Sequence, residues 1–508
     1  MRGRTLMVQG TASSVGKSLL TAALCRHFRL AGVDVAPFKA QNISLNAAVT
    51  ADGREIGRAQ AVQARACGLS PTVEMNPVLL KPEAGRGAQW VVRGRPLSAS
   101  VARDEEARRA EVVRAIEESL ASLRRRHALV LIEGAGSPAE VNLRGRDLSN
   151  MHVARLAGAP VLLVGDIERG GVFAALVGTL ELLEPEDRNR VAALVVNRFR
   201  GDPALFGDGV CFLQERTGKP VLGVVPHVPD LHVADEDAAE LPTRGRSSRP
   251  GAADVAVVQL PHISNYDDLL PLQREPGVRV RFEQRAVRLG DPDLLVLPGS
   301  KSTVADLGWL RESGWAAAVA RHARRGGRVL GICGGCQMLG ERIDDPEAVE
   351  SQASHVEGLG LLPLRTRFEP RKNTARVRMR AAAPSWLTTG LPADCELGGY
   401  EIHMGRTRPT RRGAGAFVVT ARSGEPVDAT GEAAVDGASA GNVVGTMIHG
   451  LFEGEAMRAG LLRTLGVRPV SEGHADDALD AELDRLEGVV SAALDLPALW
   501  KLVGLQGP

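Results

Sequence analysis

The chain has 508 residues, of which 44% are hydrophobic and 24% charged, so disordered, collagen-like and coiled-coil classes are excluded. At roughly 100–200 residues per domain, this length predicts more than one domain. Lys and Arg total 62 against 61 Asp and Glu, and aromatic residues make up 3%. A nucleic-acid partner is therefore not expected, since neither a basic excess nor stacking platforms are available.

The cysteines and the apolar runs predict a cytoplasmic protein without a membrane partner. The first ten residues contain no apolar core of a signal peptide. The longest apolar runs, such as Ala159–Val164, have the length of a strand rather than of a membrane span. Six scattered cysteines are too few for a disulfide scaffold, which favours a reducing compartment.

Residues 1–235 predict an α/β domain. Short runs of Val, Ile and Leu alternate with helix-length amphipathic segments, which is typical of a mostly parallel sheet flanked by helices. Several runs end in Gly, Asn, Asp or Glu, at the edge where such sheets bind ligands. The expected strands are Thr5–Gln9, Val33–Phe38, Leu129–Glu133, Val161–Gly165, Val191–Val196 and Val221–Val225.

The first strand leads into a phosphate-binding loop over residues 10–18. A strand, a loop of small residues and a helix-like segment at Leu19–Leu30 follow one another, so backbone N–H groups and the helix dipole favour bound phosphate. Gly16 and Lys17 are expected to bind the nucleotide, and Ser18 also to hold Mg²⁺. Thr11 stands where the usual pattern has its first glycine.

Other strand ends in this half supply further candidates. Glu133 closes a strand within a glycine turn, where a second Mg²⁺ ligand belongs; the alternative is an ordinary solvated acid. The side-chain amide of Asn197 is suited to hydrogen bonds with the edge of an adenine, and equally to capping the end of its strand. The amide-rich loop after the second strand, which holds Lys39 and Asn42, is consistent with substrate contacts or with a solvated loop.

The pattern breaks at residues 236–252, which are charged and contain Ser, Pro and Gly, as in a linker. A second α/β domain is expected over residues 253–465, with a section of shorter, antiparallel strands between about Leu359 and Val419. Residues 466–508 predict a helical tail, with one or two helices over its acidic part. The strands expected first in this second domain are Val255–Leu260, Val278–Phe282, Leu294–Leu297 and Val329–Ile332.

A nucleophilic thiol is predicted at Cys333. A buried strand, the cysteine and a helix follow in immediate succession, so the thiol is expected at the N-terminus of a helix, where nucleophilic cysteines are found. The N–H of Gly334 then faces an oxyanion, and a second donor is expected from the turn at Gly299. The spacing to Cys336 leaves three alternatives open: a redox pair, half of a zinc site, or two buried packing residues.

The expected base for this thiol is His449, which ends a strand before a glycine turn. His403 is the second candidate, because it alternates with Glu401 on one strand face and suits substrate binding. A structural role is the alternative for any single histidine.

The run Gly331-Ile-Cys333-Gly-Gly-Cys-Gln337 resembles the Gly-x-Cys-x-Gly-x-Gln elbow of class I glutamine amidotransferases, whose catalytic histidine matches His449. Those domains usually carry His-x-Glu, whereas Leu451 stands two residues after this histidine, as in the cobyric acid branch of the class. Glu453 and Glu401 are the nearby carboxylates that could replace the third member.

The first half is similar to dethiobiotin-synthetase-like ATPases. With both halves in this order, nearly the whole chain resembles the glutamine-hydrolysing cobyric acid synthase family. The stretches that carry this closer resemblance are Gln9–Ser18, Phe38–Asn46, Glu133–Asp147, Asp166–Phe173, Asn197–Asp202, Pro298–Thr303 and Tyr400–Gly405.

The resemblance implies a ligase of cobalamin biosynthesis that uses ATP, Mg²⁺ and glutamine to amidate the b, d, e and g carboxylates of adenosylcobyrinic acid a,c-diamide. It also implies an acyl phosphate intermediate and the movement of ammonia between two sites. The alternatives are amidation of another acid, such as the substrate of the sister cobyrinic acid a,c-diamide synthases, and a regulatory phosphate-loop ATPase without enzymatic activity. An intact pair of Cys333 and His449 favours an enzyme.

Overall fold

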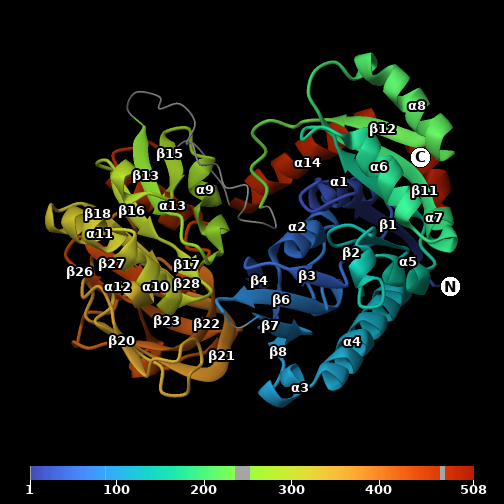
Figure 1. The fold of residues 1–508 in the computed structure, drawn as a ribbon. Coiled ribbons are helices and arrows are strands. Elements are labelled where there is room, and N and C mark those ends of the chain that lie inside the picture. Colours follow the sequence, from blue (N-terminus) through green and yellow to red (C-terminus); the bar gives the residue numbers. More distant parts are fainter. Residues whose placement is uncertain (1, 86, 235–251, 393, 470–474, 508) are drawn as a thin grey trace.

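The computed structural model describes residues 2–85, 87–234, 252–392, 394–469 and 475–507. They form two α/β domains that contact each other through a smaller layer of strands (Figure 1). The predicted linker at 236–252 lies outside the described residues, except for residue 252. The α/β fold class with mostly parallel sheets, expected from the alternating pattern, is confirmed.

The first domain is built on a six-stranded sheet in which all neighbours pair in parallel. Strands form at the six predicted places. The central strand β1 has β9 on one side and β10 on the other, so the loop after β1 opens where the strand order reverses, the usual ligand crevice of such sheets. In spatial order the strands are β12 (Val221–Pro226), β11 (Val191–Phe199), β10 (Val161–Asp166), β1 (Arg4–Gly10), β9 (Leu129–Glu133) and β2 (Val35–Phe38).

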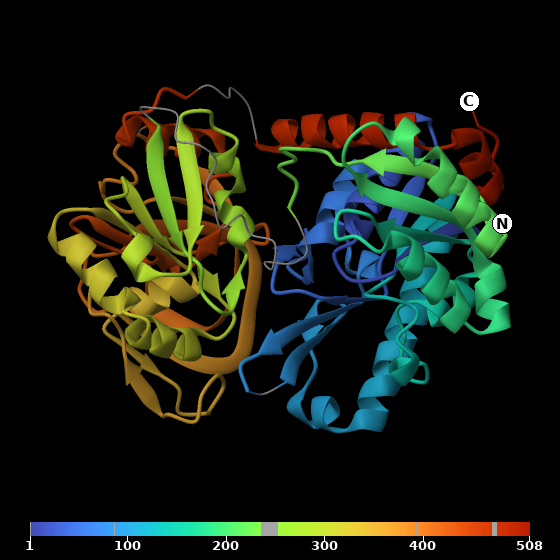
Figure 2. The same ribbon diagram turned by 45° about the horizontal axis from the view of Figure 1, so that its top comes forward.

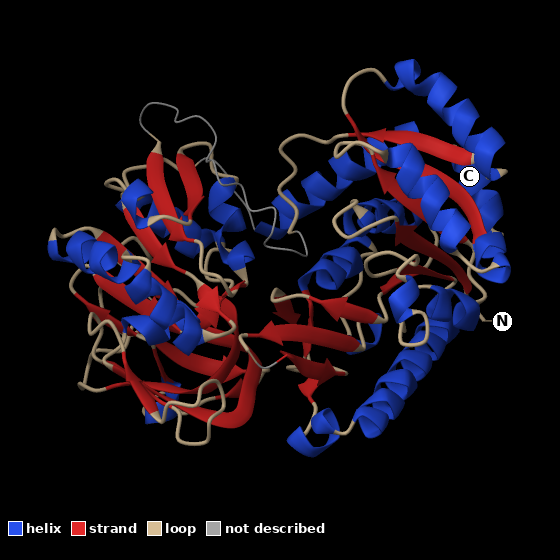
Figure 3. Ribbon diagram, in the orientation of Figure 1, coloured by secondary structure: helices blue, strands red, loops and turns tan. Residues whose placement is uncertain are grey.

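Helices cover both faces of this sheet (Figure 3). α1 (Lys17–Leu30) begins directly after the phosphate loop and buries one apolar face that includes Leu20, Leu24 and Phe28. Within the described residues, no helix is both long enough and apolar enough to cross a membrane. The other helices of this domain are α2 (Arg58–Ala66), α3 (Ala99–Arg103), α4 (Glu105–Arg126), α5 (Met151–Ala157), α6 (Val172–Leu182), α7 (Pro185–Arg190) and α8 (Gly207–Thr217).

The C-terminal tail returns to the first domain as α14 (Ala475–Ala493) and α15 (Leu496–Val503), and α14 lies along that domain in Figure 2. Leu483 and Leu486 are buried in the same apolar cluster as α1. The acidic face of α14 pairs with basic residues of α1, as in the 2.7 Å contact between Arg26 Nε and Asp484 Oδ1. Helices α14 and α15 are therefore part of the core of the first domain.

The second domain also has a six-stranded sheet, in which five strands are parallel and the edge strand β26 is antiparallel. Its order places β18 between β16 and β27, so the segments that follow these three strands meet at one edge. The strands are β15 (Val278–Glu283), β13 (Ala253–Val258), β16 (Leu294–Leu297), β18 (Arg328–Ile332), β27 (Val443–Thr446) and β26 (Ala438–Ala440).

A second, mostly antiparallel sheet packs beside it and contains the region between Leu359 and Val419 for which antiparallel strands are predicted. Its strands are β20 (His355–Glu357), β19 (Arg342–Asp344), β21 (Leu364–Ala381), β22 (Leu397–Pro409), β28 (Ile448–His449), β23 (Phe417–Arg422), β24 (Glu425–Pro426) and β25 (Val435–Asp436). The helices are α9 (Leu270–Gln273), α10 (Thr303–Glu312), α11 (Trp315–Arg324), α12 (Gly334–Leu339) and α13 (Glu455–Thr464), and a two-stranded pair joins β14 (Ile263–Ser264) to β17 (Gly299–Ser300).

The layer between the domains comes from residues 41–96, for which the sequence predicts no strands. It consists of a four-stranded sheet and a separate hairpin. Apolar side chains of this layer, including Val49 and Leu79, form a buried cluster with Tyr400 and Ile402 of β22. The strands are β3 (Gln41–Ile43), β6 (Val78–Glu83), β7 (Gly87–Val92) and β8 (Arg95–Pro96), with β4 (Ala47–Val49) and β5 (Glu55–Gly57) in the hairpin.

Candidate active sites

Cys333 occupies a tight turn between β18 and α12. Its backbone has φ 50° and ψ −110°, a conformation that non-glycine residues rarely adopt. Such backbone strain costs about 1–3 kcal/mol and is found mostly at functional sites. The side chain is buried, and Sγ lies 3.8 Å from the carbonyl oxygen of Ile402 on the antiparallel sheet. The turn therefore presents one thiol at the start of a helix.

Three neighbouring strands bring the predicted thiol site together. Cys333 follows β18, Gly299 follows β16 after Pro298, and His449 ends β28, which follows β27 after the single residue Met447. The fit is close enough to require glycines. A Cβ on Gly299 would lie 3.1 Å from Cε1 of His449, and one on Gly334 would lie 2.8 Å from the backbone nitrogen of Ser300. The two predicted oxyanion donors thus lie at this same strand edge.

His449 is held by a carboxylate. Its Nδ1 donates to Oδ2 of Asp268 over 2.7 Å, and both side chains are buried. Burial alone would lower the pKa of His449, but the charge of Asp268, together with the interaction with Cys333, raises it to about 10. With Nδ1 bound to Asp268, Nε2 remains for the thiol. The imidazole therefore holds a proton that a leaving group next to Cys333 can accept.

The residue facing His449 corrects an expectation from the sequence. Neither Glu401 nor Glu453 is the partner of Nδ1. Glu401 instead accepts two 3.0 Å hydrogen bonds from Arg422, and Glu453 lies 3.6 Å from Arg58. The residue found there, Asp268, lies on a short 3₁₀ turn, Tyr266–Leu269, that follows β14.

The signal for Asp268 in the sequence was weak but present. Two adjacent aspartates, Asp267 and Asp268, occur a few residues beyond the first strand of the second domain. A carboxylate near the end of a parallel strand is a candidate for an active site. Nothing in the sequence, however, connects this pair to a histidine 181 positions later.

The alternatives for Cys336 and His403 can be compared with the geometry. Cys333 and Cys336 are both free thiols, and burial raises the pKa of the Cys336 thiol well above its ordinary value. Among the described residues, no group of three or more His, Cys, Asp and Glu is placed to hold a metal ion. Burial lowers the pKa of His403, whose Nδ1 donates to the carbonyl of Gly405 over 3.2 Å.

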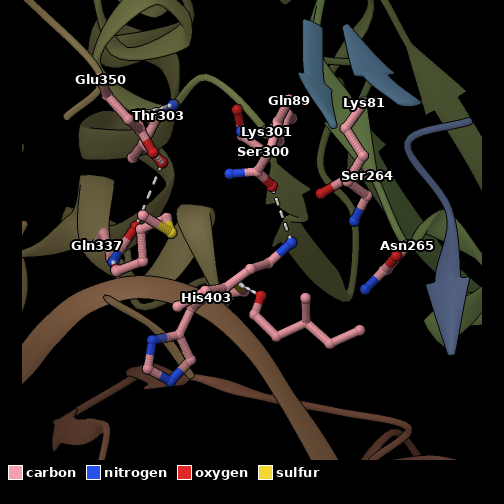
Figure 4. Close-up of a pocket in the computed structure, with 14 residues that line it drawn as sticks. Lys81, Gln89, Ser264, Asn265, Ser300, Lys301, Thr303, Gln337, Glu350 and His403 are labelled. Carbon is pink, nitrogen blue, oxygen red and sulfur yellow. Dashed lines mark hydrogen bonds between the residues drawn. The ribbon is translucent and has the colours of Figure 1, made fainter. Parts of the chain in front are cut away.

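A small pocket beside Cys333 has walls from both domains (Figure 4). Lys81 and Gln89 belong to the first domain and face residues of the second domain. The pocket encloses about 40 Å³ of free space, far below the several hundred Å³ of a typical small-molecule site, so a substrate must widen it. The lining residues of the second domain are Ser264, Asn265, Ser300, Lys301, Thr303, Cys333, Gln337, Glu350, Lys372, Ile402, His403 and Met404.

The loop predicted to bind phosphate, residues 10–18, lies between β1 and the start of α1. Gly16 is the N-cap of α1 with φ 92°, a left-handed conformation that glycine adopts without strain. Lys17 Nζ donates to the carbonyls of Ala12 and Gly136 at 2.9 and 3.1 Å, so it lies across the loop. Ser18 Oγ donates to Oε1 of Glu133 over 2.8 Å. Residues from β9 and from the loop after β1 therefore meet at the start of α1.

Glu133 is an ionised carboxylate in a fully buried setting. Burial raises its pKa, but the ammonium of Lys39, 2.9 Å from Oε1, outweighs this effect and lowers the pKa below the ordinary value. Gln63 Nε2 donates to the other oxygen over 2.6 Å. Paired oxygens from Glu133 and Ser18 are the hard donors that Mg²⁺ takes, and in nucleotide sites one or two such ligands suffice beside the phosphates.

The remaining candidates lie near this loop. Asn197 is buried at the end of β11 and donates from Nδ2 to the carbonyl of Val15 over 2.8 Å, so its amide supports the phosphate loop. Asn42 is also buried, and its Nδ2 donates to Gln60 over 2.9 Å. The predicted adenine contact of Asn197 and the predicted substrate contacts of Lys39 and Asn42 stay predictions.

The comparisons with known proteins agree with this two-site arrangement. Residues 6–241 match the CobQ/CobB/MinD/ParA nucleotide binding domain family, and residues 254–457 match the CobB/CobQ-like glutamine amidotransferase domain family. A cobyric acid synthase of Sorangium cellulosum is 54% identical and covers 100% of both chains. Relatives of the same name from Paracoccus denitrificans and Moorella thermoacetica are 50% and 46% identical, covering 98% and 99% of this chain and 99% and 98% of their own.

Proposed function

This chain belongs to the cobyric acid synthase family, and on that premise we propose that its two sites act in series on a corrinoid substrate. It is a glutamine-hydrolysing amide ligase of cobalamin biosynthesis. The amidated groups are the b, d, e and g carboxylates of adenosylcobyrinic acid a,c-diamide. Glutamine supplies the nitrogen, and ATP supplies the free energy.

In the second domain Cys333 is the nucleophile. Its thiolate attacks the side-chain amide carbon of glutamine, while the N–H groups of Gly334 and Gly299 stabilise the oxyanion. His449 then gives its proton to the departing ammonia. A pKa of about 10 keeps this imidazole protonated at neutral pH, and Asp268 holds it in the orientation that leaves Nε2 facing the thiol. Water hydrolyses the resulting glutamyl thioester.

In the first domain the phosphate loop binds ATP. Lys17 leaves its two carbonyl partners to contact the β- and γ-phosphates, and Asn197 keeps the loop in shape beside the base. Ser18 and Glu133 would hold Mg²⁺, which neutralises phosphate charge when bound. A substrate carboxylate attacks the γ-phosphorus of ATP and releases ADP, which forms an acyl phosphate. Ammonia then attacks the acyl carbon and displaces inorganic phosphate, which leaves the amide.

Lys39 and Asn42 follow β2, at the same strand edge as the phosphate loop. We assign them to the substrate side of this site, because Lys39 stands 2.9 Å from Glu133 and so borders the position of the reacting phosphate. A corrinoid carboxylate that enters there would replace Glu133 as the carboxylate that pairs with Lys39.

The observation that carries the proposal is the joint construction of the pocket beside Cys333. Lys81 and Gln89 of the nucleotide domain complete its wall, so ammonia released at the thiol is already at the border between the domains. The thiol site lies at this border, and the chain belongs to a family of amide ligases. Both observations favour direct transfer of ammonia from Cys333 to the nucleotide site. The six free cysteines favour work in a reducing cytoplasm.

The test uses the full chain with cobyrinic acid a,c-diamide in its adenosylated form, ATP, Mg²⁺ and either glutamine or ammonium, with amides counted by mass spectrometry. Cys333→Ala should lose synthesis from glutamine and keep synthesis from ammonium. Lys17→Ala should lose both. Cys336→Ala is the matched control, because it removes a buried thiol three residues away and should keep both activities. Loss of ammonium-driven synthesis in Cys333→Ala would contradict separate sites, and amidation of other acids only would contradict the substrate.

A further inference from the structure

One residue of the nucleotide domain reaches the histidine site of the other domain. Arg58 is the first residue of α2, and its side chain is 14% exposed. Its Nη2 lies 2.5 Å from Oδ2 of Asp267 and donates to Oη of Tyr400 over 2.6 Å. Nη1 lies 3.6 Å from Glu453. All three partners belong to the second domain.

Two partners of Arg58, Asp267 and Tyr400, adjoin His449 or the residue that holds it. Asp267 precedes Asp268, which accepts hydrogen bonds of 2.7 Å from both His449 Nδ1 and the backbone N–H of Gly450. Tyr400 is stacked on the imidazole, with ring centroids 5.3 Å apart and planes at 20°. The guanidinium carbon of Arg58 lies 5.4 Å from the centroid of the same tyrosine ring.

The segment that precedes Arg58 also forms hydrogen bonds with the start of the turn that carries Asp268. Asn265 begins the 3₁₀ turn that carries Asp268, and its backbone N–H donates to Oδ1 of Asn46 over 2.8 Å. In return, the N–H of Ala47 donates to Oδ1 of Asn265 over 3.0 Å. The carbonyl of Asn46 also accepts the backbone N–H of Arg58 over 3.2 Å. One segment of the nucleotide domain therefore contacts the turn of Asp268 at two points, Asn265 at its start and Asp267 beside Asp268.

We propose that Arg58 is a positioning residue for glutamine hydrolysis, which the nucleotide domain supplies to the Asp268–His449 pair. The inference rests on the proposed function of Cys333 and His449. Arg58 does not line the pocket beside Cys333 and touches neither the thiol nor the imidazole. It acts through two neighbours: its charge holds Asp267 and with it the turn of Asp268, and its hydrogen bond fixes the ring that packs on His449.

The consequence is that docking of the nucleotide domain adds contacts that hold the residues around His449 in place. A guanidinium suits this role, because its planar fork makes directed contacts with a carboxylate and a phenol at once. Loss of a hydrogen bond to a charged group in a buried site costs more than loss of a surface contact. Cross-domain contacts that do not reach the turn or the tyrosine should matter far less.

The test measures glutamate release by the full-length protein, with kcat and KM for glutamine determined separately. Arg58→Met should lower kcat by about tenfold or more and leave KM within about threefold, because the pocket is intact. Arg58→Lys should recover part of kcat, since it keeps the charge facing Asp267 but not the second contact. Synthesis from ammonium should persist in both variants.

The matched control is Arg376→Met. Arg376 also crosses the domain border, but its Nε donates over 3.1 Å to a backbone carbonyl, that of Val49, instead of to the residues around His449. It should change kcat by less than about threefold. An unchanged kcat in Arg58→Met, an equal loss in Arg376→Met, or a rise in KM without a fall in kcat would each overturn the proposal.

The proposed function can fail separately from this inference. Glutamate release needs only Cys333 and the histidine pair, so the assay reads the effect of Arg58 whichever acid the nucleotide domain amidates. A wild-type protein that releases glutamate but leaves the corrinoid unchanged would refute the substrate and not the role of Arg58. A wild-type protein without glutaminase activity would refute both.

Discussion

Replacing Asp268 by Asn tests the geometry of the glutaminase site most directly. Asp268 accepts two buried hydrogen bonds, from Nδ1 of His449 and from the N–H of Gly450, each 2.7 Å long. Asn has the same shape, and its single carbonyl oxygen can satisfy Gly450. Its amide NH₂ then faces Nδ1 of His449. The ring must accept there and carry its proton on Nε2, where a neutral imidazole no longer serves as a base for the thiol.

The expected magnitude follows from the interactions that are lost. A hydrogen bond to a charged group contributes about 1.5–3 kcal/mol, which corresponds to roughly 10- to 150-fold in rate. The wrong tautomer adds to this loss, and the equivalent change in a Ser-His-Asp triad lowers kcat by about 10⁴. We therefore expect kcat for glutamine hydrolysis to fall by about 10²- to 10⁴-fold, with KM within about threefold because Asp268 is not part of the pocket wall.

The assay is glutamate release by full-length Asp268→Asn, with synthesis from ammonium as the measure of an intact nucleotide domain. Asp436→Asn is the matched control. Asp436 is a buried aspartate that likewise accepts two hydrogen bonds, from Thr446 Oγ1 at 2.5 Å and from the N–H of Met447 at 3.0 Å, but not from His449. A kcat of Asp268→Asn within about threefold of the wild type would refute the assignment of Asp268 as the residue that orients His449.

Two further predictions concern charge. Among the described residues, Glu133 is the only carboxylate shown to accept a hydrogen bond from Ser18. Glu133→Gln should therefore raise the Mg²⁺ concentration needed for half-maximal synthesis from ammonium by about tenfold or more, while glutamate release changes little. An unchanged Mg²⁺ titration would contradict the role of Glu133. The pKa of His449 lies at about 10 in the folded protein and is 6.5 ordinarily, so its contribution to stability is complete below pH 6.5 and disappears as the pH rises through about 10. Scanning calorimetry should therefore show that the wild type loses more thermal stability than Asp268→Asn between pH 6.5 and pH 10.5, and parallel losses would contradict the charge pairing.

The sequence was sufficient wherever a site is made from one continuous segment. The phosphate loop and the turn of Cys333 are each a strand, a few small residues and a helix, so local patterns contain their geometry. His449 can be predicted from the sequence for a related reason, because a histidine at the end of a strand in a parallel sheet must lie at the ligand edge. Its partner Asp268 cannot be predicted in this way. The contact between the two depends on how a 3₁₀ turn 181 residues earlier in the chain packs against β28.

The contribution of one domain to the other's site was also beyond the sequence. Arg58 begins an ordinary amphipathic helix, and an arginine at a helix start is usually a solvated residue. The strands over residues 41–96 that carry this helix toward the second domain are short, and four of the six have three residues or fewer. Runs of this length do not rise above the background of apolar residues in a sequence of 508.

The short helix α2 gives the two sites a common mechanical support. Arg58 at its first position contacts the residues around His449, and Gln63, five residues later, donates to Glu133 Oε2 and to the carbonyl of Ser18 at 2.6 and 3.3 Å. At 1.5 Å per residue these anchors are separated by only about 7.5 Å along the axis. A helix of nine residues does not bend appreciably over this distance. Any movement of Glu133 and Ser18 that displaces α2 would therefore displace Arg58 as well. We expect any coupling between nucleotide binding and glutamine hydrolysis to pass through this rigid helix rather than through a flexible loop.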